Sequence, residues 1–591
     1  MIKLKGQYAR LSDAVLKMGA FYENRNRTLD YLKLLDADRM LYNFRLTFGV
    51  PTNCEPLGGW EEPTGLLRGH STGHFLSALA LAYSATGDKL FKDKMDYIVA
   101  ELRKLQLMCK GKASDFVCKG DSEHPEPELW STNPAEWGEG FLSAYSPDQF
   151  ALLEKFTKYS KIWAPYYTLH KIVAGLIDCY TRGGNSEALD CAKGIAGWIA
   201  DRLAPLSEEH RTKMWSMYIA GEFGGMNESL TSLYNITGEE KYLVTAKMFD
   251  NKNIFPGLSN GEDTIKNLHA NQHIPQILGA VEEYMATDDD FYYNIGKNFF
   301  DIVTGHHMYA IGGVGQGESF RNPDELAANI KEATNCETCA AYNMLKLSRM
   351  LYALNPDVKY MDYYERALIN QIMASQTPFV SENVHNGVTY MLPIGPGAEK
   401  EYTDDYNSFT CCHGTGMENH VKYTDASFFI DENGTLFVNQ YVPCEYNGKV
   451  SVNIDTLFPA GGGTITVSGK EDCEVLFRIP TWCQNPFNLP QEGRYARLSH
   501  KGGSTDVIEV NFNYEVRFET TPDKLNDKTI GAVMYGPFVM VCENSYKNYL
   551  TIGKNLTPVE GEVALTGYGL KFVPMYKMHG KPYHTYFIIE E

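Results

Sequence analysis

Residues 75–88 read Phe75-Leu76-Ser77-Ala78-Leu79-Ala80-Leu81-Ala82-Tyr83-Ser84-Ala85-Thr86-Gly87-Asp88. Large apolar side chains such as Phe75, Leu79 and Tyr83 recur every three or four residues, which is the spacing of one buried helix face. The helical pattern stops at Thr86-Gly87-Asp88, whose glycine and aspartate are typical of a tight turn. The stretch therefore predicts a helix that ends in a hairpin turn.

A similar turn follows several other helical stretches between Tyr22 and Gln371. These turns are Gly183-Gly184-Asn185, Thr237-Gly238-Glu239, Thr287-Asp288-Asp289 and Asn355-Pro356-Asp357. Their spacing fits a repeat of about 50 residues, with one further turn hidden between the first two. Repeated helical hairpins must stack to bury their inner faces. Six hairpins closed into a ring form an (α/α)6 toroid with a central funnel, which we predict here, and an open solenoid is the alternative.

Beyond Gly434 the apolar residues recur with a period of two, which marks half-buried strands. The clearest run, Val510-Phe512-Tyr514-Val516-Phe518, alternates with polar residues and predicts one strand. Shorter runs separated by Gly, Asn, Asp and Pro are typical of β-sandwiches. We therefore expect a mainly α chain with β, a toroid followed by C-terminal β-sandwich domains. The predicted divisions are an N-terminal segment (1–20), the (α/α)6 toroid catalytic domain (21–430), a first β-sandwich (431–520) and a second sandwich or part of a composite one (521–591).

Charge and composition argue against two classes of partner. The chain has 591 residues, with 54 Lys and Arg against 74 Asp and Glu, which gives a net charge of −20. A surface this acidic repels nucleic acid and anionic membranes on average. The apolar stretches are also shorter than the roughly 20 residues that a membrane helix needs. Neither nucleic acid nor a membrane is expected as a partner, and a homodimer is left open.

The cysteine content favours a reducing compartment. The 13 cysteines are odd in number and scattered over a long chain, unlike the dense and even frameworks of disulfide-rich proteins. The start, Met1-Ile2-Lys3-Leu4-Lys5-Gly6, is followed by Arg10 and Asp13 rather than by the apolar core of a secretion signal. We expect a cytoplasmic protein, although a signal removed from this sequence would leave the same pattern.

Two short segments bring metal-binding residue types together. Cys411 and Cys412 are adjacent, and the upstream segment Cys336-Glu337-Thr338-Cys339 opens a strongly helical stretch. Adjacent cysteines rarely pair with each other, so four thiols and one carboxylate are free to meet in the fold. Soft thiolates with one oxygen favour tetrahedral Zn²⁺. A zinc site is one interpretation, and cysteines that merely fill space in a helical core are the other.

Other residues of the helical half are candidates for a ligand site. The glycine-rich run at 312–317 brings the backbone close to whatever Glu318 faces. Five histidines are candidates to line a polar funnel and bond substrate hydroxyls: His70, His74, His170, His269 and His273. Five aromatic residues are candidates for the floor of a sugar site, although aromatics at helix starts belong more often to the core: Trp60, Trp163, Tyr166, Tyr167 and Trp215.

Four motifs of the chain form a specific combination. They are Gly315-Gln316-Gly317-Glu318-Ser319-Phe320, Glu337-Thr338-Cys339-Ala340, Tyr364-Glu365-Arg366-Ala367-Leu368-Ile369-Asn370 and Cys411-Cys412. In their order and approximate spacing they resemble the β-L-arabinofuranosidases of glycoside hydrolase families 127 and 146. The likeness extends into the β region at Arg478-Ile479-Pro480-Thr481-Trp482-Cys483. The resemblance implies an (α/α)6 catalytic domain followed by β-sandwich domains, in agreement with the turn spacing.

The resemblance also implies roles for individual residues. It implies Zn²⁺ held by Glu337, Cys339, Cys411 and Cys412. It further implies Cys411 as nucleophile and Glu318 as general acid/base of a retaining, exo-acting hydrolase that releases β-L-arabinofuranose from arabinose-containing glycans of plant type. Together with His74 of the funnel, the candidate substrate contacts are His170, His269, His273, Glu365 and Tyr390. Because Glu318 would have to be protonated first and ionised later, its pKa is expected to be raised toward neutrality.

This chain departs from the resemblance at two places. Cys336 lies where one branch carries a small residue, and a fifth ligand there would put the role of Glu337 in doubt. After the cysteine pair, His413-Gly414-Thr415-Gly416 looks more like the family 146 branch. Substrate preference is expected to differ accordingly.

Three other functions fit parts of the same pattern. A toroid with funnel histidines also suits a sugar epimerase, which needs no metal. An inverting glycosidase would use two carboxylates, with Glu222, Asp404 or Asp405 as the base. A carbohydrate-binding protein with purely structural zinc would need no catalytic groups. The effect of chelation, the anomer of the product and the consumption of an arabinoside separate these possibilities.

Overall fold

Largely buried helices form a closed ring in the N-terminal part of the chain. A computed structural model describes residues 4–455 and 457–590; residues 1–3, where the predicted N-terminal segment begins, and residue 591 lie outside the described residues. The ring consists of α3 (His70–Thr86), α6 (Pro165–Thr181), α9 (Met226–Thr237), α12 (Ala270–Thr287), α14 (Thr338–Leu354) and α16 (Cys411–Asn419). Each packs against the next, and α16 packs against α3. The helical domain is therefore toroid-like, as predicted, rather than an open solenoid.

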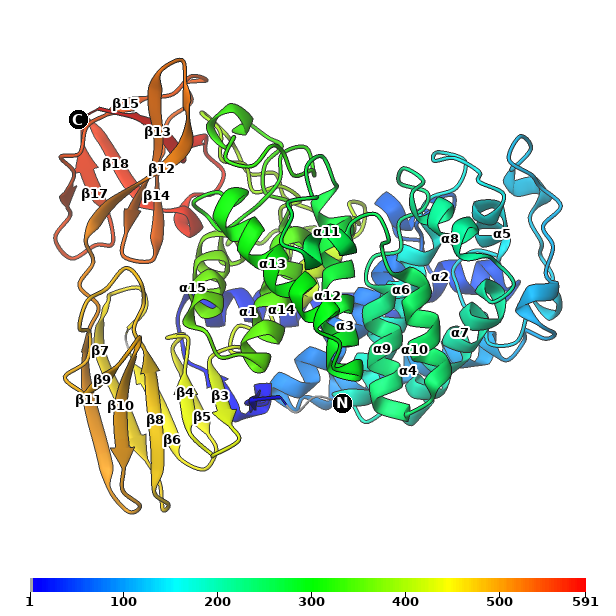
Figure 1. Ribbon diagram of the computed structural model, residues 1–591, viewed down its shortest axis with the longest axis horizontal. Coiled ribbons are helices and arrows are strands. Elements are labelled where there is room, and N and C mark those ends of the chain that lie inside the picture. The colour runs from blue at the N-terminus through cyan, green and yellow to red at the C-terminus, as the bar shows by residue number, and fades with distance from the viewer. Residues whose placement is uncertain (1–3, 456, 591) are drawn as a thin grey trace.

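A second set of helices packs against this inner ring, and Figure 1 labels them beside it. Five of them pack against the inner helix that precedes them: α4 (Lys89–Gln106), α7 (Ser186–Leu203), α10 (Glu240–Ala246), α13 (Asp290–His306) and α15 (Val358–Ala367). The predicted turns join these pairs. At the first turn Gly87 has a φ of +69°, and Asp88 caps α4 by accepting a hydrogen bond from the Leu90 amide. The shorter helices are α2 (Ala37–Thr47), α5 (Asp148–Glu154), α8 (Glu208–Trp215) and α11 (Phe255–Ser259).

We expected a further turn hidden between the first two hairpins, and this prediction is wrong. Residues 107–164 join α4 to α6 with short 3-10 helices and α5, and the described residues hold no hairpin there. The sixth inner helix is instead α16, which comes far later in the chain and packs against α3. Tyr31 of α1 (Ala20–Leu34) lies 3.0 Å from His413 of α16, between the hydroxyl and Nε2. Turn spacing could not show this, because the two partners are far apart in sequence.

The first β domain consists of two sheets that share one hydrophobic core. One sheet has the order β1 (Gly6–Tyr8), β3 (Phe428–Asp431), β4 (Leu436–Val438), β8 (Cys473–Arg478), β10 (Tyr495–His500), β9 (Gln491–Glu492). The other has the order β11 (Thr505–Asn511), β7 (Gly462–Ser468), β6 (Ser451–Asp455), β5 (Cys444–Asn447), β2 (Ala14–Leu16). The N-terminal segment therefore supplies one edge strand to each sheet, through the pairs β1–β3 and β2–β5.

A separate nine-stranded sheet ends the chain, and both β parts lie on the same side of the helical ring (Figure 1). Its strands are β12 (Val516–Leu525), β13 (Lys528–Tyr535), β14 (Phe538–Glu543), β15 (Thr551–Ile552), β16 (Thr557–Pro558), β17 (Leu565–Gly567), β18 (Leu570–Pro574), β19 (Tyr583–His584) and β20 (Tyr586–Ile589). The prediction of one strand through Val510–Phe518 is wrong, because β11 ends at Asn511 and β12 begins a different sheet. Alternation alone does not reveal where a chain passes from one sheet to another.

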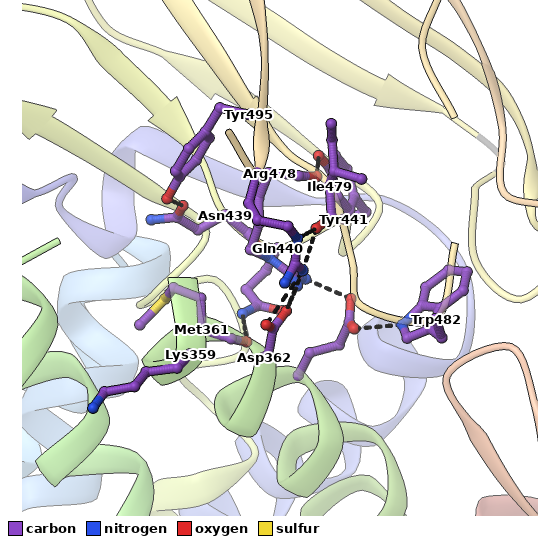
Figure 2. Close-up of polar contacts among 12 residues, drawn as sticks. Lys359, Met361, Asp362, Asn439, Gln440, Tyr441, Arg478, Ile479, Trp482 and Tyr495 are labelled. Atoms are coloured by element: carbon purple, nitrogen blue, oxygen red, sulfur yellow. Dashed lines mark hydrogen bonds and ion pairs between the residues drawn. The ribbon is translucent and has the colours of Figure 1, made fainter. Parts of the chain in front are cut away.

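A buried arginine joins the first β domain to the helical ring. The side chain of Arg478 is fully buried, and its guanidinium donates to Asp362 at 2.6 Å and to Glu365 at 2.7 Å. Both carboxylates lie on α15. The Trp482 indole donates to the second oxygen of Glu365 at 2.8 Å, and Figure 2 shows Arg478 between Asp362 and Trp482. The interface therefore depends on a buried charge network whose hydrogen bonds are satisfied.

No helix within the described ranges is long and apolar enough to cross a bilayer.

We expect Arg478→Ala to lower the free energy of unfolding by about 3–5 kcal/mol, because it leaves the buried Glu365 without a counter-charge and leaves Asp362 with Arg494 alone. The matched control is Arg497→Ala, since Arg497 pairs with Glu474 and Glu492 at the exposed surface. Its loss should cost about 0–1 kcal/mol. Denaturant titration followed by tryptophan fluorescence measures both, and equal losses would contradict the assigned role.

Candidate functional site

A cavity of about 520 Å³ opens where inner helices of the ring begin. Its wall includes Ala164, His269 and Glu337, which are the N-cap residues of α6, α12 and α14. Cys411, the first residue of α16, also lines it. Helix N-termini carry partial positive charge and stabilise anions close to them. The ring therefore directs several such ends at one space that holds thiols and carboxylates.

Three thiols and one carboxylate converge in the wall of this cavity. The ligand atoms of Glu337, Cys339, Cys411 and Cys412 all lie within 4.8 Å of one another, and all four residues are buried. The Cys412 sulfur lies 3.1 Å from that of Cys339 and 3.9 Å from that of Cys411. The Cys411 sulfur lies 3.6 Å from a Glu337 oxygen. A disulfide needs about 2.05 Å, so these sulfurs are free thiols.

The chemistry of this cluster fits a metal ion. A tetrahedral centre with ligand distances of about 2.0–2.3 Å separates its donors by about 3.3–3.8 Å, close to the separations found here. The Glu337 Oε2 atom is buried and has no hydrogen-bond partner. Burial raises the pKa of the Cys411 thiol to about 12 and the pKa of Glu337 well above its usual value. A cation would reverse both penalties, so these four side chains could hold one.

Cys336 lies outside this group. Its backbone has a φ of +62°, and its side chain packs at Gly313 in an apolar cluster that includes Tyr309 and Ile311. The turn at Cys336 separates it from Cys339, which lies three residues later in the first turn of α14. The neighbouring carbonyls of Cys336 and Glu337 both accept hydrogen bonds from Gln371. Glu337 is therefore the residue of this segment that faces the thiols, and the fifth-ligand alternative is not supported.

Glu318 faces the same cavity from the loop before α14. The Ala270 amide donates to its carbonyl at 2.7 Å, which sets the carboxylate beside His269. The Nε2 atom of His269 lies 3.5 Å from Glu318 Oε2, and the Tyr390 hydroxyl donates to Oε1. His269, Glu318 and Glu337 form a second group whose ligand atoms lie within 4.8 Å. The cavity therefore brings Cys411 and Glu318 together.

The prediction that the pKa of Glu318 is raised toward neutrality is wrong for this arrangement. The hydrogen bond from His269, followed by that from Tyr390, lowers the pKa of Glu318. Burial disfavours the charge of His269, but Glu318, Glu337 and Glu222 outweigh burial and raise the pKa of His269 to about 9. Protonated His269 loses the long 3.3 Å contact in which its Nδ1 accepts from the Gln272 amide. The charged pair prevails because a charge-assisted bond is the stronger one.

The other candidate contacts lie in three different places. His273 lines the cavity, and burial lowers its pKa to about 4, so it is neutral at neutral pH. His74 and His170 are buried behind the wall, where His74 bonds Glu418 at 2.6 Å and His170 accepts from the Gly225 amide. Glu365 does not line this cavity; it binds Arg478 at the domain interface. The motif that contains Glu365 therefore contributes to the interface between the helical ring and the first β domain.

The sequence motifs did not identify several residues of the cavity as primary candidates. Glu222 appeared above only as a base for an inverting reaction, yet it lines the wall, and burial raises its pKa to about 7. Asp404 and Asp405 do not line it; Asp405 bonds His385 and Asp404 caps its own loop. Tyr159 and Tyr218 line the outer wall. Both tyrosines belong to irregular loops, where no periodicity marks a residue for function.

Comparison with known proteins agrees with this geometry. Residues 14–425 match the family model described as Beta-L-arabinofuranosidase, GH127 catalytic domain. A solved GH127 beta-L-arabinofuranosidase from Geobacillus stearothermophilus T6 superposes with a TM-score of 0.69 at 15% identity, over 98% of this chain and all of the other. A second, described as a GH127 beta-arabinofuranosidase, gives 0.69 and 15% over 99% of this chain and 98% of its own. No curated protein matches the sequence.

The cluster predicts how metal content responds to single substitutions. Cys339→Ser or Cys412→Ser should weaken metal retention by at least about 100-fold, because each removes one soft donor from a buried set. Cys336→Ser is the matched control, since its thiol is buried nearby but faces away. Elemental analysis after dialysis measures the metal per chain. Equal loss in all three variants would place the metal elsewhere.

The paired charges predict a pH response. His269 should titrate near pH 9, and Glu318→Gln should move that midpoint down toward the ordinary value of about 6.5. Because the folded pKa is raised, the stability that protonated His269 contributes is complete below about pH 6.5 and lost as pH rises through 9. NMR of ring-labelled histidine follows the titration. Asp324→Asn, which affects only exposed His306, is the control; an unchanged His269 midpoint in Glu318→Gln would contradict the pairing.

Proposed function

Because this chain belongs to the GH127 β-L-arabinofuranosidase family and is thus a glycosidase, we propose that it is a retaining, exo-acting enzyme that releases β-L-arabinofuranose from arabinose-containing plant-type glycans. One observation carries the proposal. A thiol that can attack, Cys411, and a carboxylic acid that can transfer a proton, Glu318, line one cavity on either side of Glu337. A retaining reaction needs a nucleophile and an acid/base that can reach the same glycosidic bond.

We infer that the metal is Zn²⁺, held by Glu337, Cys339, Cys411 and Cys412. Three sulfur donors and one oxygen suit zinc better than magnesium or calcium, which prefer oxygen. When bound, zinc would supply the positive charge that keeps the cysteines ionised at neutral pH. The Thr415 hydroxyl, 3.1 Å from the Cys339 sulfur, and the Gln371 amide, which binds the Glu337 backbone, orient the donors.

In the first step of the proposed reaction the Cys411 sulfur attacks the anomeric carbon. A carbon–sulfur bond forms, the bond to the leaving oxygen breaks, and Glu318 gives that oxygen a proton. In the free site the proton of the pair resides on His269, so it must move from His269 to Glu318 as the leaving oxygen approaches. This transfer requires only the 3.5 Å gap between Nε2 and Oε2 to shorten.

In the second step a water molecule attacks the same carbon from the side of the departed group. Glu318 takes the proton of that water, the carbon–sulfur bond breaks, and Cys411 leaves as a thiolate. Two displacements at one carbon restore the starting configuration. The lowered pKa of Glu318 suits this step, because the carboxylate must be ionised to act as a base.

Sugar binding near the reacting carbon would fall to neutral and amide groups of the wall. His273 is neutral, and Asn271 and Gln272 lie beside it on the first turn of α12. Such groups both donate and accept hydrogen bonds, as sugar hydroxyls require. We do not assign this role to Glu365, His74 or His170, whose side chains are occupied elsewhere in the protein.

One observation favours an inverting reaction as the second candidate. Glu222 lines the cavity with a pKa near 7, so it is able to serve as the base that activates water. In that case the thiols would hold a structural metal, and Cys411 would form no bond to the sugar. The anomer formed first distinguishes the two reactions.

The proposed compartment is a reducing one, such as the cytoplasm. All 13 cysteines lie in the described part of the chain, and each is unpaired. Oxidation of the cluster would join two of its sulfurs and remove a nucleophile.

Cys411→Ser should lower kcat by at least about 10⁴-fold on a β-L-arabinofuranoside, because the sulfur nucleophile is lost. Cys54→Ser, at a partly exposed thiol outside the cluster, should keep full activity. NMR of the fresh product should show the β anomer first. Release of the α anomer, together with Glu222→Gln inactivation, would replace the retaining proposal with the inverting one; full activity of Cys411→Ser would refute the nucleophile.

A further inference from the structure

Aromatic rings lead from the sulfur cluster to the surface along one wall of the cavity. The centroid distances are 6.4 Å from Tyr390 to Trp60, 5.1 Å from Trp60 to Trp163, 5.5 Å from Trp163 to Tyr159 and 6.5 Å from Tyr159 to Tyr218. All five residues line the same cavity. We call them the aromatic track. Its inner end, Tyr390, also contacts Glu318.

The outer end of the track contributes little to the core. Tyr218 is 81% exposed and Tyr159 is 39% exposed, whereas Trp60 and Trp163 are half-buried against the apolar cluster that contains Cys411. A ring as exposed as Tyr218 gains little from folding, since the hydrophobic contribution follows the area removed from water. Packing therefore does not explain why the chain holds this ring at the mouth of the cavity.

The backbone beside Tyr218 is strained. The Ala220 amide donates to the Tyr218 carbonyl at 2.6 Å, which closes a three-residue turn around Ile219 at a φ of +56°. A β-branched residue rarely adopts positive φ, and a γ-turn of this hand is uncommon. Ala164, at a φ of +39°, and Glu318, at +64°, are strained on the same cavity wall. Strain of this kind gathers at functional sites, because the fold must maintain it against relaxation.

The cavity also has polar lining residues. Ser216 and Asn253 bond each other at 3.1 Å, and Asn251 and Gln272 line the cavity as well. The space therefore offers both aromatic rings and hydroxyl and amide groups. A sugar ring has the matching character, with apolar C–H faces and hydroxyl groups around its edge. Pockets that combine aromatic surface with a few polar groups bind small organic ligands of this kind.

We propose that the outer half of the cavity is a leaving-group subsite for a neutral oligosaccharide, in which Tyr159 and Tyr218 are specificity-determining stacking platforms. The inference rests on the proposed function, because the subsite would bind the oligosaccharide that is attached to arabinose through the scissile oxygen. At about 520 Å³ the cavity falls in the range of roughly 300–1,000 Å³ that holds drug-sized molecules, which are much larger than one pentose. The extra space continues along the track to the surface.

The charges near the track select against an anionic chain. Glu222, Glu318 and Asp250 all line the cavity. Its two cations are already paired, because protonated His269 lies beside Glu318 and Lys252 lies 3.7 Å from Asp250, and the whole chain carries a net charge of −20. A uronate or phosphate along the track would meet unfavourable charge. The occupant is therefore a neutral glycan.

The experiment compares β-L-arabinofuranosides whose leaving group is methanol, one neutral sugar or three neutral sugars. In the wild-type protein kcat/KM should rise with the length of the leaving group. Tyr218→Ala and Tyr159→Ala should each lower kcat/KM about three- to tenfold for the longest substrate, mainly through KM, and leave the methyl glycoside within twofold. Tyr218→Phe should behave as wild type, because stacking uses the ring and not the hydroxyl.

Tyr568→Ala is the matched control, since Tyr568 is 50% exposed on the C-terminal sheet, far from the cavity in sequence and fold. It should leave all three substrates unchanged. If kcat/KM does not depend on leaving-group length, or if Tyr218→Ala acts equally on the methyl glycoside, the subsite is refuted while the hydrolase stands.

Inactivity of the wild-type protein on all three substrates would refute the proposed function instead. Fluorescence quenching of Trp60 and Trp163 by the free trisaccharide then tests the track by itself. Quenching that is weaker in Tyr218→Ala supports the track, and absence of quenching overturns it.

Discussion

The free-energy cost of burying negatively charged groups is the constraint that determines how the candidate site is built. Three thiols and the Glu337 carboxylate share a space only 4.8 Å across, away from water. Ionised groups so placed repel one another and lose their hydration, unless positive charge is near. The fold meets this constraint by starting α14 and α16 at the cluster, so that helix N-termini face the anions. The closed ring of helices is what brings those two starts together.

The same electrostatic effects act differently on the two groups of residues that line the cavity. On the cysteine side, burial raises the pKa of Cys411 and Glu337, and only a cation makes the thiol a good nucleophile. On the opposite side, His269 already supplies positive charge and keeps Glu318 ionised. A proton held by a pair can move between its members with little rearrangement. Acid and base function would thus belong to the His269–Glu318 pair rather than to one carboxylate.

Short motifs identified some residues of the cavity and misplaced others. Glu318, Glu337 and Cys411 meet in one cavity. The motif that contains Glu365 instead ties α15 to the first β domain through Arg478, because a buried charge network leaves as strong a pattern as a substrate contact. Tyr159 and Tyr218 escaped notice, since loops have no periodicity, and a single exposed tyrosine carries no signal without its neighbours.

The sequence by itself determined the helical ring, the later β domains and the residue types of the Glu337 and cysteine cluster, because hydrophobic period, turn chemistry and short motifs are local properties. Only the tertiary structure decided which ends of the chain close the ring, where the run at 510–518 divides between sheets and how Glu318 titrates. These properties depend on contacts between residues far apart in the chain. His269 and Glu318 are 49 positions apart, and no local pattern records that their side chains pair.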